Sequence, residues 1–138
     1  MKKSMIYKVL IIAFLVLNIK AYSQACLGYH EDYIRAKYPY NVWYSGYIND
    51  GSRYISSVMT FGTFYYFFNS NTGECYLCTQ VPFNQNTLNT IVQDYNNTYV
   101  ITSDTSWSAY LDNGVIMYIK LIWVEADQKS VFYYTYTK

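Results

Sequence analysis

The chain has 138 residues, with 10 Lys or Arg against 9 Asp or Glu and a formal net charge of +1. Four of the cations lie within the first 20 residues, so residues 24–138 carry six cations and nine acids, a net charge of −3. Because phosphate binding requires clustered Lys and Arg, this composition argues against nucleic acid and anionic lipid as partners.

The first segment has the layout of a secretory signal peptide. Three lysines in the first eight residues precede an apolar run over 9–17, and Ala21 and Ser23 place small residues at the end of the following polar stretch. This pattern predicts that 1–23 is a signal peptide, cleaved after Ser23. The apolar run is about half the roughly 20 residues that a membrane span requires, which argues against a membrane anchor.

Cleavage leaves 24–138 as a single exported domain, periplasmic or extracellular, in which we expect no transmembrane segment. The alternative is a lipoprotein that carries its lipid on Cys26. Ser23, three positions before that cysteine, stands where lipoproteins carry leucine, which argues against lipidation.

The pattern along 24–138 predicts two helices within a set of antiparallel strands, an α+β fold with both helices on one face of the sheet. The first helix covers 28–37 and is ended by Pro39. The second carries apolar residues from Leu88 to Tyr95 on one face. Alternating apolar runs between Gly, Asn and Asp turns predict strands over 42–48, 53–61, 63–69, 74–81, 98–103, 115–124 and 131–137, with a short segment over 107–111.

The order of these elements suggests an internal repeat. Each helix is followed by a strand and, about 20 residues later, by a long aromatic hairpin, over 64–81 and 116–137. This layout fits a tandem helix-plus-three-strand repeat. Chance similarity within a tyrosine-rich chain is the alternative.

Tyrosine is the compositional outlier, with 19 residues beside seven Phe and three Trp. Tyrosine suits half-buried strand surfaces and is enriched at interfaces. In 115–124, one set of alternate residues, including Met117 and Ile119, suits a core, while the other contains Tyr118 and Lys120. Helices on one side of the sheet would leave an aromatic surface on the other, which is typical of a binding site. A curled sheet or a covering loop is the alternative.

Three cysteines follow the expected cut: Cys26, Cys75 and Cys78. The last two form C-x-x-C within an expected strand, where positions i and i+3 face opposite sides, which argues against a redox pair. A zinc site is disfavoured because the chain has only one histidine. A disulfide from Cys26 to Cys75 or to Cys78, or no disulfide at all, are the alternatives that the sequence leaves open.

The sequence predicts neither a catalytic site nor a cofactor. The single histidine, His30, precedes Glu31 and Asp32, but adjacent helical residues do not share a face. Nucleophile motifs are absent from the sequence, and most carboxylates stand in expected turns, where Asp serves the backbone. A small hydrolase that uses paired carboxylates is the least favoured alternative.

The run Tyr-Phe-Phe-Asn-Ser-Asn-Thr-Gly-Glu-Cys over 66–75, with Pro82, the segment 88–100 and Trp107 after it, resembles small exported bacterial proteins of unknown function. The tandem layout is similar to that of the β-lactamase inhibitor protein and of outer-membrane assembly lipoproteins. Those proteins are binding modules, so the resemblance implies a binding role through a sheet face or loops and assigns no residue.

We therefore expect an exported binding module, an inhibitor or adaptor that holds an extracytoplasmic protein partner against an aromatic sheet face. The expected contacts are Tyr65, Phe67, Tyr118 and Lys120. The alternative is a glycan or cell-wall binding protein, with Trp43 and Trp107 stacking on sugar rings.

Overall fold

A computed structural model describes residues 25–111 and 114–137. It confirms the α+β class: two helices accompany an eight-stranded sheet whose neighbouring strands are all antiparallel. The predicted signal peptide lies outside the described residues. In chain order the elements are α2 (Glu31–Lys37), β1 (Tyr44–Tyr47), β2 (Arg53–Met59), β3 (Gly62–Phe68), β4 (Cys75–Val81), α3 (Gln85–Thr98), β5 (Val100–Ser103), β6 (Ser106–Tyr110), β7 (Ile116–Val124), the 3-10 turn η2 (Glu125–Asp127) and β8 (Lys129–Thr137).

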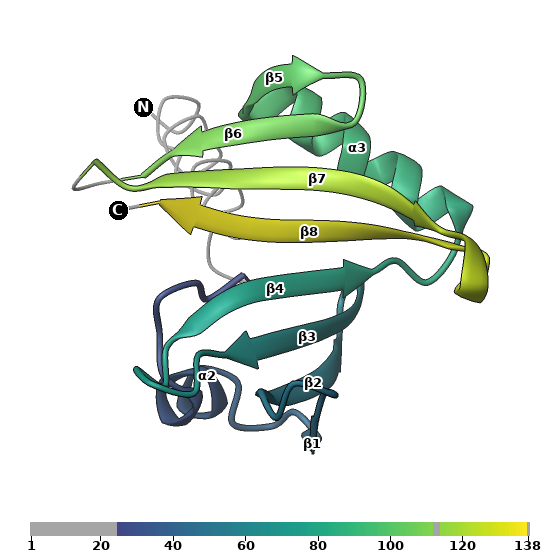
Figure 1. The fold of residues 1–138 in the computed structure, drawn as a ribbon. Coiled ribbons are helices and arrows are strands. Elements are labelled where there is room, and N and C mark those ends of the chain that lie inside the picture. The colour runs from purple at the N-terminus through teal and green to yellow at the C-terminus, as the bar shows by residue number, and fades with distance from the viewer. Residues whose placement is uncertain (1–24, 112–113, 138) are drawn as a thin grey trace, which may run out of the picture.

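The strand order is β1-β2-β3-β4-β8-β7-β6-β5, so β1 and β5 are the two edges of the sheet (Figure 1). Each half of the chain supplies one helix followed by four strands, and the last strands of the halves, β4 and β8, meet in the middle. That central seam has three residue pairs, Cys78 with Tyr134, Thr79 with Tyr133 and Gln80 with Phe132. The predicted sequence repeat stays a prediction.

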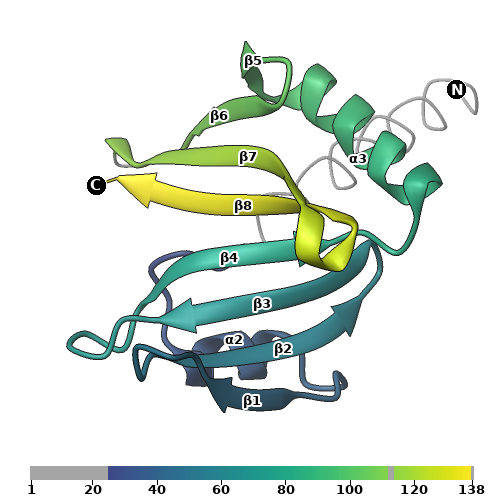
Figure 2. The same ribbon diagram turned by 45° about the vertical axis from the view of Figure 1, so that its right-hand side comes forward.

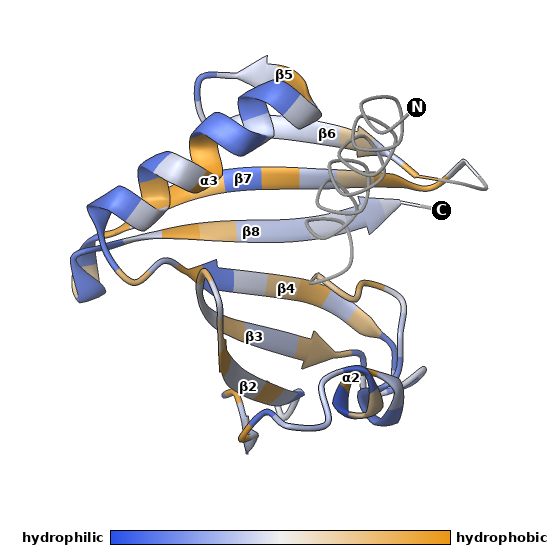
Figure 3. Ribbon diagram, turned by 180° about the vertical axis from the view of Figure 1, so that it is seen from behind, coloured by the Kyte–Doolittle hydropathy of each residue, from blue (hydrophilic) through white to orange (hydrophobic). Residues whose placement is uncertain are grey.

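Both helices cover the same face of the sheet. Figure 3 views the molecule from behind and shows α2 and α3 in front of the strands, while Figure 2 shows α3 lying along the β6–β7 half. Asn84 caps the start of helix α3, because its side chain accepts a hydrogen bond from the Thr87 backbone N–H. The helix buries Leu88, Ile91 and Tyr95. The Tyr95 ring lies edge-on to Trp107 and Phe132 of the sheet, at centroid distances of 5.7 and 5.4 Å.

The strands bury alternate residues toward the helices, as their period of two requires. In β3, Phe64, Tyr66 and Phe68 are buried while the residues between them are half-buried. In β7, Met117 and Ile119 are 2% and 1% exposed, whereas Tyr118 and Lys120 are exposed. The prediction that β7 has a core face and an outer face is confirmed.

Helix α2 begins at Glu31, three residues later than the sequence predicts, because residues before it pair with β4. Gly28 has a φ of +81°, its N–H donates to the Cys75 carbonyl, and the Cys75 N–H donates to the Tyr29 carbonyl. Gly28 and Tyr29 thus both lie opposite Cys75, which makes a β-bulge. The bulge requires a left-handed backbone conformation, which glycine adopts without strain. This bulge holds residues 25–29 against the sheet, with Ala25 and Cys26 buried.

Within the part of the chain that the structure describes, neither helix has the length and apolar character needed to cross a membrane.

Candidate functional site

The side of the sheet opposite α2 and α3, here called the open face, carries an aromatic surface that crosses both halves. Strand pairing places Tyr65 beside Thr79, Thr79 beside Tyr133, and Tyr133 beside Lys120. A neighbouring row begins with Tyr54 beside Phe67. By the alternation of the strands, the open face carries Tyr44, Tyr54, Tyr65, Phe67, Tyr110, Tyr118 and Tyr133.

The aromatic rings of this face support one another along the surface. The Tyr54 ring lies 6.1 Å from the Tyr65 ring and 5.8 Å from the Phe67 ring, in tilted contacts. Gly46 of the neighbouring strand makes room for Tyr54, because a Cβ at Gly46 would lie 2.8 Å from the Tyr54 hydroxyl oxygen. The rings are therefore held partly in place. Tyr54, Tyr65 and Phe67 are half-buried, and Tyr118 on the same face is 41% exposed.

The charge of the open face differs in sign from that of residues 24–138. At the described strand positions of this face the charged side chains are Lys120 and Lys129, and no Asp or Glu stands among them. An aromatic surface that carries two lysines and no carboxylate suits a partner surface with apolar and acidic side chains.

The structure places the four expected protein contacts on the same face of the sheet, in two pairs that are separated by β4 and β8. Tyr65 and Phe67 lie on the open face of β3, and Tyr118 and Lys120 lie on the open face of β7, across the central seam. The alternation of apolar residues was the signal that grouped them. Tyr133, at the middle of the same surface, was missed because β8 contains Tyr133, Tyr134 and Tyr136, and composition does not distinguish the outward tyrosine.

The two tryptophans expected to stack on sugars lie elsewhere. Trp107 is 1% exposed and its indole N–H donates to Asn96 Oδ1 at 2.8 Å, so the prediction that it lies at a binding surface is wrong. Helix α3 covers it, which the local strand pattern could not reveal. Trp43 is half-buried beside α2, where its ring lies 6.1 Å from the Tyr66 ring and 5.7 Å from the Arg35 guanidinium carbon.

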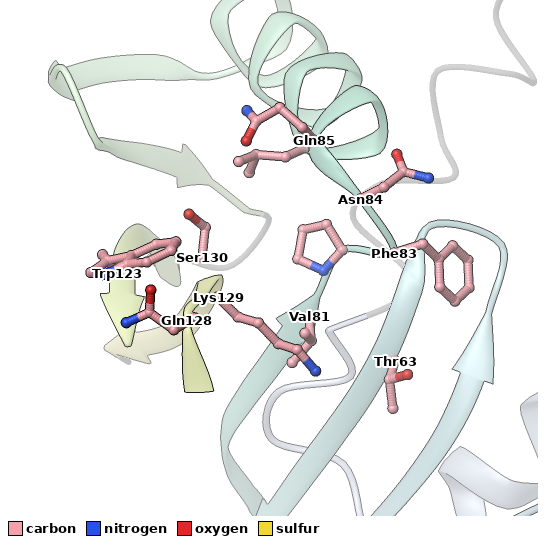
Figure 4. Close-up of a pocket in the computed structure, with 11 residues that line it drawn as sticks. Thr63, Val81, Phe83, Asn84, Gln85, Trp123, Gln128, Lys129 and Ser130 are labelled. Atoms are coloured by element: carbon pink, nitrogen blue, oxygen red, sulfur yellow. The ribbon is translucent and has the colours of Figure 1, made fainter. Parts of the chain in front are cut away.

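The third tryptophan, Trp123, lines a cavity of about 350 Å³ between the end of β4, the start of α3 and the β7–β8 turn. Figure 4 shows the Trp123 indole on one side of this cavity, with Ser130 next to it, Gln128 and Lys129 below and Gln85 above. Trp123 is 56% exposed because it lies at the far end of β7. Strand alternation assigns Trp123 to the core side, so this cavity could not be predicted from the alternation of residues.

A second cavity, of about 420 Å³, contains His30 and Glu31. The Glu31 carboxylate accepts hydrogen bonds from Arg35 Nε at 2.9 Å and from Arg53 Nε and Nη2 at 2.7 and 3.0 Å. The Arg53 hydrogen bonds, with Arg35, hold the pKa of Glu31 below its ordinary value. A carboxylate fixed between two guanidinium groups is an ion pair that ties α2 to β2, and is unsuited to proton transfer.

The three cysteines are buried thiols. The register shifts between Phe67 and Phe68, so that Cys75 lies opposite Phe68 and Cys78 opposite Tyr66, both on the helix side. The expectation that the C-x-x-C side chains face opposite sides is therefore wrong, because it assumed a regular strand. Burial raises the pKa of Cys75 to about 12, and also raises the pKa of Cys26 and of Cys78, which suppresses the reactive thiolate.

The structure contains no disulfide from Cys26 to Cys75 or Cys78, so it has the arrangement without a disulfide that the sequence also left open. Attachment of a lipid at Cys26 would require residues 25–29 to leave the sheet, because that side chain is 4% exposed. In the described residues no group of three or more His, Cys, Asp or Glu side chains could hold a metal ion.

No family model, no characterised protein and no solved structure matches this chain.

Proposed function

We propose that this chain is an exported binding module that holds a protein partner, as an inhibitor or adaptor, against the open face of its sheet. The observation that supports the proposal most directly is the continuous row from Tyr65 through Tyr133 to Lys120, which crosses both halves of the sheet. Interfaces between proteins are enriched in tyrosine at their centres, where a large ring is fixed at low entropic cost.

Burial within the sheet supports the same reading. The tyrosines that the core needs, Tyr66, Tyr95 and Tyr134, lie on the helix side and are at most 6% exposed. The open-face tyrosines are not required to fill that core. A contiguous aromatic face with few charges is typical of a surface that binds a partner.

The proposal is tested by placing a photo-crosslinking amino acid at Tyr118 in the exported protein. The matched control carries it at Gln93, which is exposed on the outer side of α3. We expect a single discrete adduct from position 118 and none from position 93, with the adduct lost when Tyr65→Asp is added. Equal adducts from both positions, or none from position 118, would contradict the proposal.

Glycan binding is the second candidate function, and the Trp123 cavity favours it. An exposed indole beside the amides of Gln85 and Gln128 and the Ser130 hydroxyl offers a stacking surface and hydrogen-bonding groups. Oligosaccharides released from bacterial cell wall, titrated while tryptophan fluorescence is recorded, test this function. A change that disappears in Trp123→Phe and persists in Trp43→Phe supports it, whereas an unchanged spectrum counts against it.

A further inference from the structure

Strand β1 presents an unpaired edge. It pairs with β2 alone, and no other strand lies on its outer side among residues 25–111 and 114–137. The Ile48 N–H donates to the Ser52 carbonyl, so the backbone groups of Ile48 face β2. Every second residue of a strand directs its backbone groups to the same side, so Gly46 and Tyr44 also face β2. Ser45 and Tyr47 therefore direct their N–H and C=O groups outward, where they are available to another strand.

This edge lacks the features that usually prevent strand pairing. Residues 38–49 contain no charged side chain. Four large apolar or aromatic side chains around the strand are 65 to 97% exposed: Tyr40, Val42, Tyr44 and Tyr47. An edge protected against association would carry Lys, a bulge or a proline within the strand.

The opposite edge, β5, serves as an internal comparison. Its pairing with β6 shifts register between Ile101 and Ser103, and Asp104 follows directly. A bulge and an adjacent charge both interfere with the addition of a further strand. The two edge strands of the described sheet thus differ. Strand β1 pairs in an unbroken register and has no charged residue next to it in the sequence, whereas β5 has a register shift and an adjacent aspartate.

We propose that β1 pairs antiparallel with β1 of a second copy of this chain, about a two-fold axis at Ser45. This inference is independent of the proposed function. In this register Trp43 of one copy lies opposite Tyr47 of the other, and Tyr44 lies opposite Gly46. Tyr44 then meets the Tyr54 ring that lies over Gly46, so the glycine and the aromatic side chains complement one another across the axis.

A second copy fits this edge because the pairing is self-complementary and brings no like charges together. Each copy contributes outward backbone groups at the same positions, as an isologous two-fold contact requires. The pairing would join two eight-stranded sheets into one and would continue the open face across the axis.

Sedimentation of the exported protein over a range of concentrations tests this proposal. We expect a monomer–dimer equilibrium in the unaltered protein. Ser45→Lys places two ammonium groups opposite each other at the axis and should move the dimerisation midpoint to a concentration at least roughly tenfold higher. Ser45 is exposed, so this change should leave the fold intact, which circular dichroism checks. Ser45→Thr keeps the strand neutral and should leave the dimer unchanged.

Ile101→Lys, which places the same charge on β5, is the matched control for the other edge. A dimer weakened by Ser45→Lys and unaffected by Ile101→Lys supports the proposal. A protein that is monomeric at every concentration, or a dimer that depends on Ile101 and not on Ser45, overturns it.

Discussion

Tyr134→Phe should destabilise this protein far more than Tyr95→Phe, although each change removes one hydroxyl oxygen. The two hydroxyl oxygens lie 2.5 Å apart in the core, and the Tyr134 hydroxyl also lies 2.5 Å from Gln80 Oε1. Gln80 Nε2 donates to the Phe61 carbonyl at 3.0 Å, which fixes Oε1 as an acceptor. The single Tyr134 proton therefore goes to Gln80, and Tyr95 donates to Tyr134.

The magnitudes follow from this direction of donation. Removal of the Tyr134 hydroxyl leaves the Tyr95 O–H without an acceptor and Gln80 Oε1 without a donor, and both residues are at most 6% exposed. Each buried, unsatisfied group costs about 1–3 kcal/mol, so the two groups left by Tyr134→Phe should cost about 2–6 kcal/mol together. Removal of the Tyr95 hydroxyl leaves the Tyr134–Gln80 bond in place and should cost about 1 kcal/mol.

Equilibrium unfolding in urea measures both free energies, provided the two variants keep the same denaturant dependence. Phenylalanine preserves the edge-on contacts of the Tyr95 ring with Trp107 and Phe132, so the comparison isolates the hydroxyl groups. Equal losses in the two variants, or a larger loss for Tyr95→Phe, would refute the assigned direction of donation.

Three further predictions concern alkaline stability, one ion pair and one glycine. Burial raises the pKa of Tyr66, Tyr95 and Tyr134 above the ordinary 10.0. The folded state should therefore keep its full stability below pH 10.0 and lose stability as the pH rises beyond it, because these tyrosines ionise first in the unfolded chain. Thermal melts at increasing pH, with tyrosinate absorbance recorded alongside, measure this loss. The Glu31 pKa is lowered, so Glu31→Gln should cost about 1 kcal/mol at neutral pH and nothing once pH falls below that lowered pKa, by urea unfolding. Gly62→Ala should cost about 3 kcal/mol or more in the same assay, because its Cβ would lie 2.2 Å from the Val81 carbonyl oxygen at a φ of +139°.

The fold class and the two faces of β7 could be predicted because each depends on a local period. Met117 and Ile119 alternate with Tyr118 and Lys120 whatever the rest of the chain does, and Leu88 to Tyr95 fall on one helical face. The side taken by Cys75 could not be predicted, because it depends on a bulge that forms only when β4 pairs with β3.

The exposure of the tryptophans could not be predicted for a related reason. Trp107 and Trp123 both stand at positions that alternate toward the helix side. Tyr95 and Asn96 of helix α3 pack against Trp107 and bury it. Trp123 lies beyond the part of the sheet that the helix covers. Length and placement of a helix across a sheet are tertiary properties, and a candidate glycan site at Trp123 follows from them alone.

The open face and the buried tyrosine network depend on the same seam. The row that joins Tyr65 to Lys120 passes through Thr79 and Tyr133, one of only three residue pairs between β4 and β8 within the described part of the chain. On the other side of the sheet, the Tyr134–Gln80 bond ties these two strands together. Loss of that bond would loosen the packing of β4 against β8 and so the alignment of the two halves of the open face, although no outward side chain is itself changed. Tyr134→Phe should therefore reduce crosslinking from Tyr118 although residue 134 is buried, and a conserved adduct yield in a folded Tyr134→Phe protein would show that each half binds by itself.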